Sequence, residues 1–141
     1  MSDRLRWGAT APPHSETVDL IARFASDWPA IPLERGQVLF IEGDRPDFLY
    51  LVKSGALRIM SGGAIYEDVG PGGIVGEMGI VEESALRSAS VIALMPSSVI
   101  PVDKAQFLAL VERAPSFALT VMRVLSRRLR AMNRRYRSGG D

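Results

Sequence analysis

The stretch GGIVGEMGIVEESALRSAS, residues 72–90, places two charged side chains inside an otherwise apolar, strand-like region. Glu77 directly follows a glycine, and Arg87 lies ten residues further along the chain. Buried Glu and Arg residues are rare unless they pair with each other or hold a ligand. The stretch therefore predicts either a structural ion pair or a polar binding site.

The residue types of this stretch suit a sugar-phosphate ligand. Its glycines let the backbone turn tightly and approach a ligand, and residues 77–83 are expected to form one short helical turn that offers N–H groups to an anion. Arg87 carries a planar, permanently charged fork that fits phosphate oxygens, and Ser88 adds a hydroxyl donor. An ionised Glu77 only accepts hydrogen bonds, so it fits a ribose hydroxyl. The alternative is a structural Glu77–Arg87 salt bridge between neighbouring β-elements, with glycines that serve the turns alone.

Short apolar runs, separated by glycine- and serine-containing turns, make up half of residues 37–102. These runs are QVLFI, FLYLV, ALRIM, AIYEDV, ASVIAL and SSVIPV. Several short strands at this spacing are typical of an antiparallel sandwich or barrel. The expected β-roll covers about residues 33–102.

Helical patterns lie on both sides of the β-like region. Residues 15–33 predict an amphipathic helix with a proline-marked exit, after a flexible lead-in over residues 1–14. Asp103 and Gln106 have the spacing of a capping box, and Pro115 suits the first position of a long last helix, so helices are expected over about 103–137. That last helix carries a coiled-coil-like seam with spacings of four and three residues, which predicts either a homodimer or packing on the chain's own β-domain. The seam consists of Ala118, Met122, Leu125, Leu129, Met132 and Tyr136.

Composition narrows the classes of function. A chain of 141 residues fits one domain, expected over residues 15–137. It has no cysteine, and its one histidine, His14, lies in the lead-in, so a thiolate or three-histidine metal site and a Ser-His-Asp triad are not expected. No apolar run reaches the ~20 residues that span a bilayer, and the start lacks the apolar centre of a signal peptide. The expected protein is cytoplasmic, without a membrane segment, a metal or an enzymatic activity.

The charge is unevenly distributed. Residues 1–115 carry 10 Lys and Arg against 15 Asp and Glu, whereas residues 116–141 carry seven Arg against one Asp. A basic helix of this kind has the charge for phosphate contacts, but no base-reading motif accompanies it. A partner- or nucleic-acid-binding module that works through this arginine-rich helix is therefore the alternative function.

With these motifs, residues 72–90 resemble the phosphate-binding cassette of the cyclic-nucleotide-binding domain family. The family's Gly-Glu pair matches Gly76-Glu77, and its Arg-Ser/Thr-Ala motif matches Arg87-Ser88-Ala89. Residues 33–60 are also similar to the family's strand-Gly-Asp-strand-Gly pattern. The positions that carry this second likeness are Gly36, Gly43, Asp44, Tyr50, Val52 and Gly55. The resemblance covers about residues 18–133.

The resemblance implies a mainly β fold, an antiparallel β-jelly-roll (double-stranded β-helix) with an N-terminal helix and a long C-terminal helix. It also implies that Glu77 binds the ribose 2′-hydroxyl and Arg87 the cyclic phosphate. Backbone donors from Gly76 to Met78, with Ser88 and Ala89, would complete the anion site. In similar bacterial activators the long helix closes over the base, and matching the chains brings Arg128, Met132 and Asn133 to that place.

The resulting expectation is a stand-alone receptor module for a cyclic nucleotide, which signals through a ligand-induced conformational change to an unknown effector. Ser88 favours cyclic AMP (cAMP) over cyclic GMP (cGMP), because cGMP-selective members often have threonine there. Two departures from the family pattern are present. Leu86 stands where many relatives have proline before the arginine, and only SGGD follows Arg137, so no helix-turn-helix and no DNA-binding domain are expected in this chain.

Overall fold

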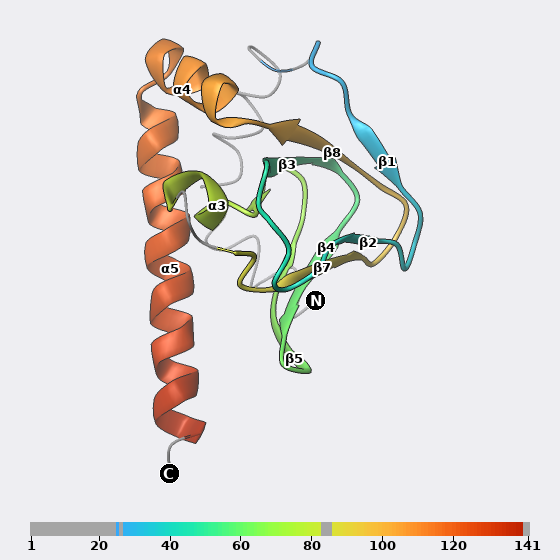
Figure 1. Cartoon of the computed structure of the whole chain (residues 1–141), viewed down its shortest axis with the longest axis vertical. Coiled ribbons are helices and arrows are strands. Elements are labelled where there is room, and N and C mark those ends of the chain that lie inside the picture. Colours follow the sequence, from blue (N-terminus) through green and yellow to red (C-terminus); the bar gives the residue numbers. More distant parts are fainter. Residues whose placement is uncertain (1–24, 26, 83–85, 140–141) are drawn as a thin grey trace, which may run out of the picture.

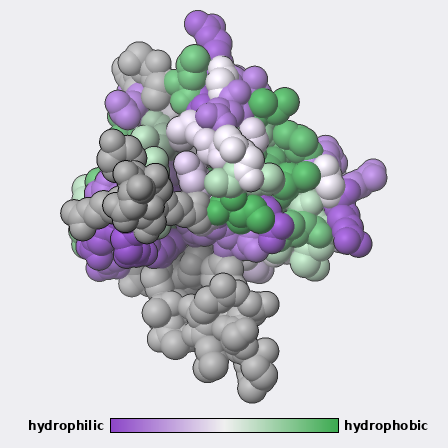
Figure 2. Space-filling model, turned by 90° about the horizontal axis from the view of Figure 1, so that it is seen from below, coloured by the Kyte–Doolittle hydropathy of each residue, from purple (hydrophilic) through white to green (hydrophobic). Residues whose placement is uncertain are grey.

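The structure, a computed structural model, describes residues 25, 27–82 and 86–139, and it consists of eight strands and three helices within that part of the chain. Figure 1 shows the strands gathered beside one long helix, α5, which runs along the whole length of the molecule. The short helix α3 lies between the strands and α5 (Figure 1). The surface seen from below mixes hydrophobic and hydrophilic areas (Figure 2).

The strands form two four-stranded sheets, and every pair of neighbouring strands is antiparallel. The first sheet has the order β1-β8-β3-β6, with β1 Ile31–Leu33, β8 Ser97–Val102, β3 Leu49–Ser54 and β6 Ile74–Val75. The second has the order β2-β7-β4-β5, with β2 Val38–Phe40, β7 Ser90–Ala93, β4 Leu57–Ser61 and β5 Ala64–Val69. This is the jelly-roll arrangement that the sequence predicts.

Two hydrophobic clusters explain why the strands of the first sheet are apolar at nearly every position. Successive side chains of a strand point to opposite faces, so neighbours on one strand enter different clusters. Leu51 and Ile100 pack with the helices, whereas the adjacent Val52 and Val99 pack between the two sheets. A strand buried on both faces reads as a continuous apolar run.

The C-terminal helices begin where the sequence indicates. α4, Lys104–Arg113, starts with a capping box in which Gln106 N donates to Asp103 Oδ1 at 2.8 Å and Asp103 N donates to Gln106 Oε1 at 3.0 Å. α5, Ser116–Gly139, follows Pro115 and packs Phe117 and Val121 against the first sheet. The capping box is confirmed, whereas Pro115, expected at the first position of the last helix, directly precedes it. The described helices include none that is long and apolar enough to cross a bilayer.

Each of the six expected runs overlaps an observed strand, while β1 and β6 lie outside those runs. Most of the stretch expected to form the N-terminal helix, residues 15–33, lies outside the described residues through its positions 15–24 and 26. α3, Met78–Val81, is the short helical turn expected after Gly76. Glu77, the residue directly before α3, contacts Arg128 of α5, so the quoted stretch lies beside that helix.

Candidate functional site

A cavity of about 380 Å³ lies between the β-roll and α5, within the range of about 300–1,000 Å³ that small-molecule sites occupy. Its walls come from the quoted stretch, from Phe40 of β2 and Glu67 of β5, and from α5. The quoted stretch supplies all six of its predicted site residues, which are Gly76, Glu77, Met78, Arg87, Ser88 and Ala89. Of the three residues expected to cover the base, Arg128 and Met132 line the cavity, whereas Asn133 is exposed and does not. Their contacts with a ligand stay predictions.

The guanidinium of Arg87 is held by backbone carbonyls and an aromatic ring. Its Nη1 donates to Gly76 O at 3.1 Å and its Nη2 to Phe48 O at 2.7 Å, and its Cζ lies 3.9 Å from the centre of the Phe40 ring. Gly76 has a φ of +77°, and a Cβ added there would lie 2.5 Å from Arg87 Nη1. Gly76 is therefore required both by its backbone conformation and by the close approach of Arg87.

Arg87 is a buried cation that forms no ion pair with a described residue, although Asp47, Glu77 and Asp44 lie near enough to favour its charge. The residue is 7% exposed, and its Nε has no hydrogen-bond partner among the described residues. Among the described residues, none of the salt bridges includes Arg87. Burial lowers the pKa of Arg87 below its ordinary value, because the charged form loses hydration. A buried, unpaired charge at a cavity wall points to an anionic ligand.

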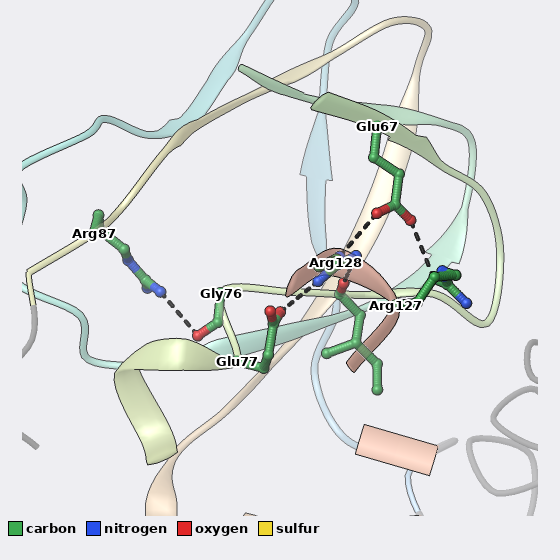
Figure 3. Close-up of polar contacts among 7 residues, drawn as sticks. Glu67, Gly76, Glu77, Arg87, Arg127 and Arg128 are labelled. Carbon is green, nitrogen blue, oxygen red and sulfur yellow. Dashed lines mark hydrogen bonds and ion pairs between the residues drawn. The ribbon is translucent and has the colours of Figure 1, made fainter. Parts of the chain in front are cut away.

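Glu77 pairs with Arg128 of α5 and not with Arg87 (Figure 3). Arg128 Nη1 donates to Glu77 Oε1 at 2.6 Å, and Glu77 is 4% exposed. The structural Glu77–Arg87 salt bridge considered from the sequence is therefore absent among the described ion pairs. The separation in the chain explains the difference, because Glu77 and its partner are 51 positions apart.

Glu67 of β5, which the sequence did not single out, completes this ionic cluster. Arg128 Nε donates to Glu67 Oε1 at 2.9 Å, and Arg127 Nη2 donates to Glu67 Oε2 at 3.3 Å (Figure 3). Burial disfavours the charge of Glu67, but Arg128 and then Arg127 outweigh it and hold the pKa of Glu67 below its ordinary value. For Arg128, burial is likewise outweighed by Glu77 and Glu67, which raise its pKa. Arg127 and Arg128, two arginines of the basic helix, therefore form ion pairs with acids of their own chain.

Comparison with known proteins decides the family. A family model described as "Cyclic nucleotide-binding domain" matches residues 30–114. The chain belongs to the cyclic nucleotide-binding domain family. The Cyclic AMP receptor protein of Thermus thermophilus is 36% identical to it over 101 residues, which cover 68% of this chain and 46% of that protein.

Solved structures of this family share the fold. The Catabolite Activator Protein of Thermus thermophilus matches with a TM-score of 0.69 and 27% identity, over 92% of this chain and 60% of that chain. The EAL enzyme Bd1971 matches in its cAMP-bound form (33% identity) and its cGMP-bound form (32%), each with a TM-score of 0.56. These matches cover 74% and 75% of this chain and 29% of each enzyme chain. The expected jelly-roll fold and the regulatory, cyclic nucleotide-binding class of domain are confirmed.

The chain spans less than half the length of the first curated relatives that it matches. These matches show the domain family of this chain, not the activities of the whole relatives.

Proposed function

We propose that this chain is a receptor module for a 3′,5′-cyclic purine nucleotide, with the cyclic phosphate at Arg87 and the ribose at Glu77. The observation that carries this proposal is the buried Arg87 cation, which lines the cavity and has no ion-pair partner among the described residues. A cyclic phosphate supplies the missing negative charge in a ring small enough for a cavity of about 380 Å³. Ser88, which also lines the cavity, adds a hydroxyl donor to the phosphate oxygens.

The same geometry supports signalling through α5. A ligand changes a conformational equilibrium only if its affinity for the two states differs. Glu77 belongs to the proposed ribose site and is also the partner of Arg128 on α5. A ribose hydroxyl that competes for Glu77 therefore acts directly on the contact between the β-roll and α5. We propose that the signal to an effector leaves through this helix and that the module works as a unit of its own.

The proposed ligand is cAMP in preference to cGMP. The choice rests on Ser88, and it is in keeping with the relative named Cyclic AMP receptor protein, although the Bd1971 enzyme was solved with both nucleotides. Calorimetric titration of nucleotide-free protein with each nucleotide is expected to give tighter binding of cAMP. Tighter binding of cGMP would contradict the preference, and binding of neither would contradict the proposed function.

The position of the base is tested by two further variants. Met132 lines the cavity and offers a polarizable apolar surface to a purine ring, whereas Asn133 offers a donor and an acceptor to the purine edge. Met132→Ala is expected to weaken the binding of both nucleotides. Asn133→Ala is expected to reduce the preference for cAMP while phosphate binding persists. If both variants bind like the parent protein, the base is covered by another part of the chain.

We further propose that the module forms a homodimer through α5. The helix has two apolar faces, of which one packs Phe117, Val121 and Val124 into its own domain. On the other face Met122 and Leu129 are each 60% exposed and Met132 is 48% exposed, and all three belong to the seam seen in the sequence. Large exposed apolar patches are uncommon on monomers.

The dimer is expected to be modest in affinity and sensitive to salt, because arginines lie close to the seam. Sedimentation at several protein and salt concentrations measures it, and Met122→Glu is expected to shift the protein to the monomer. Glu112→Lys, at an exposed position of α4, is a charge-changing control that should leave the fraction of dimer unchanged. A monomer at every concentration and salt would show that the seam does not pair two copies.

A further inference from the structure

Glu67 contacts the arginine of α5 that reaches Glu77, but nothing in the family motifs assigns it a role. We infer that Glu67 is a positioning residue: it orients Arg128 so that only one oxygen of Glu77 is taken, which leaves the other oxygen for the ribose hydroxyl. This inference rests on the proposed function and adds to it a residue that determines recognition of the ribose. Figure 3 shows Arg128 between the two carboxylates.

Three separate anchors fix the guanidinium of Arg128. Its Nε donates to Glu67 at 2.9 Å, its Nη1 to Glu77 Oε1 at 2.6 Å, and its Nη2 to Ile74 O at 2.7 Å. The guanidinium is planar and its donors are fixed relative to one another, so these three contacts determine its orientation. Only Nη1 meets Glu77, and no hydrogen bond from a described residue reaches Glu77 Oε2.

The preferred contact of an arginine with a carboxylate is different, because it uses two parallel hydrogen bonds to both oxygens. Such a bidentate contact at Glu77 would leave its carboxylate saturated when a ribose hydroxyl arrives. Glu67 prevents it, since Nε is held on the β5 side of the cavity and Nη2 is held by the Ile74 carbonyl. Without Glu67, Arg128 keeps a single carboxylate partner among the described residues. Its Nη2 then gains more from the second, charged oxygen of Glu77 than from the neutral Ile74 carbonyl, so the bidentate contact becomes its best arrangement.

Calorimetric titration with cAMP and 2′-deoxy-cAMP separates the contribution of the ribose 2′-hydroxyl to the affinity from that of the rest of the ligand. The parent protein is expected to prefer cAMP. Glu67→Leu is expected to weaken cAMP by about tenfold, the loss of one hydrogen bond to a charged group, while 2′-deoxy-cAMP changes much less. Glu67→Gln retains an oxygen for Arg128 Nε, so its affinity for cAMP should lie between those of the parent protein and Glu67→Leu. If Glu67→Leu does not fold, as judged by its thermal melt, the ratio of the cAMP and 2′-deoxy-cAMP affinities of Glu67→Gln tests the inference instead.

Two control variants test the reason for the effect. Arg127→Gln removes the longer contact to Glu67, at 3.3 Å, and should leave the ratio of the two affinities unchanged. In an Arg128→Lys background an ammonium group cannot make the bidentate contact, so Glu67→Leu should no longer alter the ratio. An equal loss for both nucleotides in Glu67→Leu, or no loss, overturns the inference but leaves the proposed function intact. A parent protein that binds neither nucleotide overturns both.

Discussion

Replacing Arg87 by alanine is expected to weaken cAMP binding by about tenfold to a hundredfold or more, the largest effect of any single side chain on affinity. Losing the partner of a charged hydrogen-bonding group costs about 1.5–3 kcal/mol. The cost applies in full here, because Arg87 is buried and no carboxylate of the described residues forms an ion pair with it. Calorimetric titration of both proteins with cAMP measures the loss.

The side chain of Arg87 also supports the local backbone, so the experiment needs controls. Arg87→Ala removes the hydrogen bonds to the carbonyls of Gly76 and Phe48, and a thermal melt shows whether the variant stays folded. Arg87→Lys keeps the charge without the fork and should bind with intermediate affinity. Arg58→Ala is the matched control, since Arg58 pairs with Asp68 at 2.8 Å outside the cavity. An Arg87→Ala protein that is folded and binds cAMP as tightly as Arg58→Ala would refute the phosphate assignment.

The sequence predicted the six strands that fall on apolar runs separated by turns, and it missed β1 and β6. β5 and β8 have the limits of the apolar runs AIYEDV and SSVIPV. β1 contains Pro32, which cannot donate to a sheet and so weakens a strand pattern. It is tolerated because β1 lies at the edge of its sheet and pairs only with β8. β6 has two residues between glycines, which is too short for any periodicity.

The pairings within the site were harder to predict than its residues. Local motifs identified the cassette residues that line the cavity, because the glycines, the acid and the arginine lie close together in the chain. The partner of Glu77 comes from a helix 51 positions away, and no local pattern fixes which way that helix faces. The resemblance placed Arg128 near the base, and the structure brings it to Glu77.

Glu67 had a usable signal in the sequence. It lies two positions before Val69, which is fully buried, so simple alternation puts both on one face of the strand. A carboxylate on a core-facing position needs a cation, and the arginine-rich segment 116–141 supplies seven arginines. Which of its arginines would reach Glu67 depends on the packing of α5 against the β-roll. That packing is set by Phe117 and Val121, about two to three turns from Arg128 along the helix.

Replacing Arg128 by methionine is expected to give the largest loss of stability, about 3 kcal/mol of unfolding free energy in the nucleotide-free protein. Removing one partner of a buried ion pair costs about 3–5 kcal/mol, because the other charge stays buried without compensation. Arg128→Met leaves two such charges, on Glu77 and Glu67, whose side chains are 6% and 20% exposed. The lower end of the range applies, since Glu67 keeps Arg127 and some contact with water.

Urea denaturation measures this loss, and two further proteins test its cause. Arg127→Met removes the neighbouring arginine, whose side chain is 44% exposed, and is expected to cost less than about 1 kcal/mol. Adding Glu77→Gln to Arg128→Met removes the more deeply buried of the two orphaned charges, so the double variant should be more stable than Arg128→Met alone. If Arg128→Met and Arg127→Met unfold at the same urea concentration, the ionic cluster does not hold α5 against the β-roll. A double variant less stable than Arg128→Met would show instead that Glu77 has a partner other than Arg128, and the contact between the proposed ribose site and α5 would need a different basis.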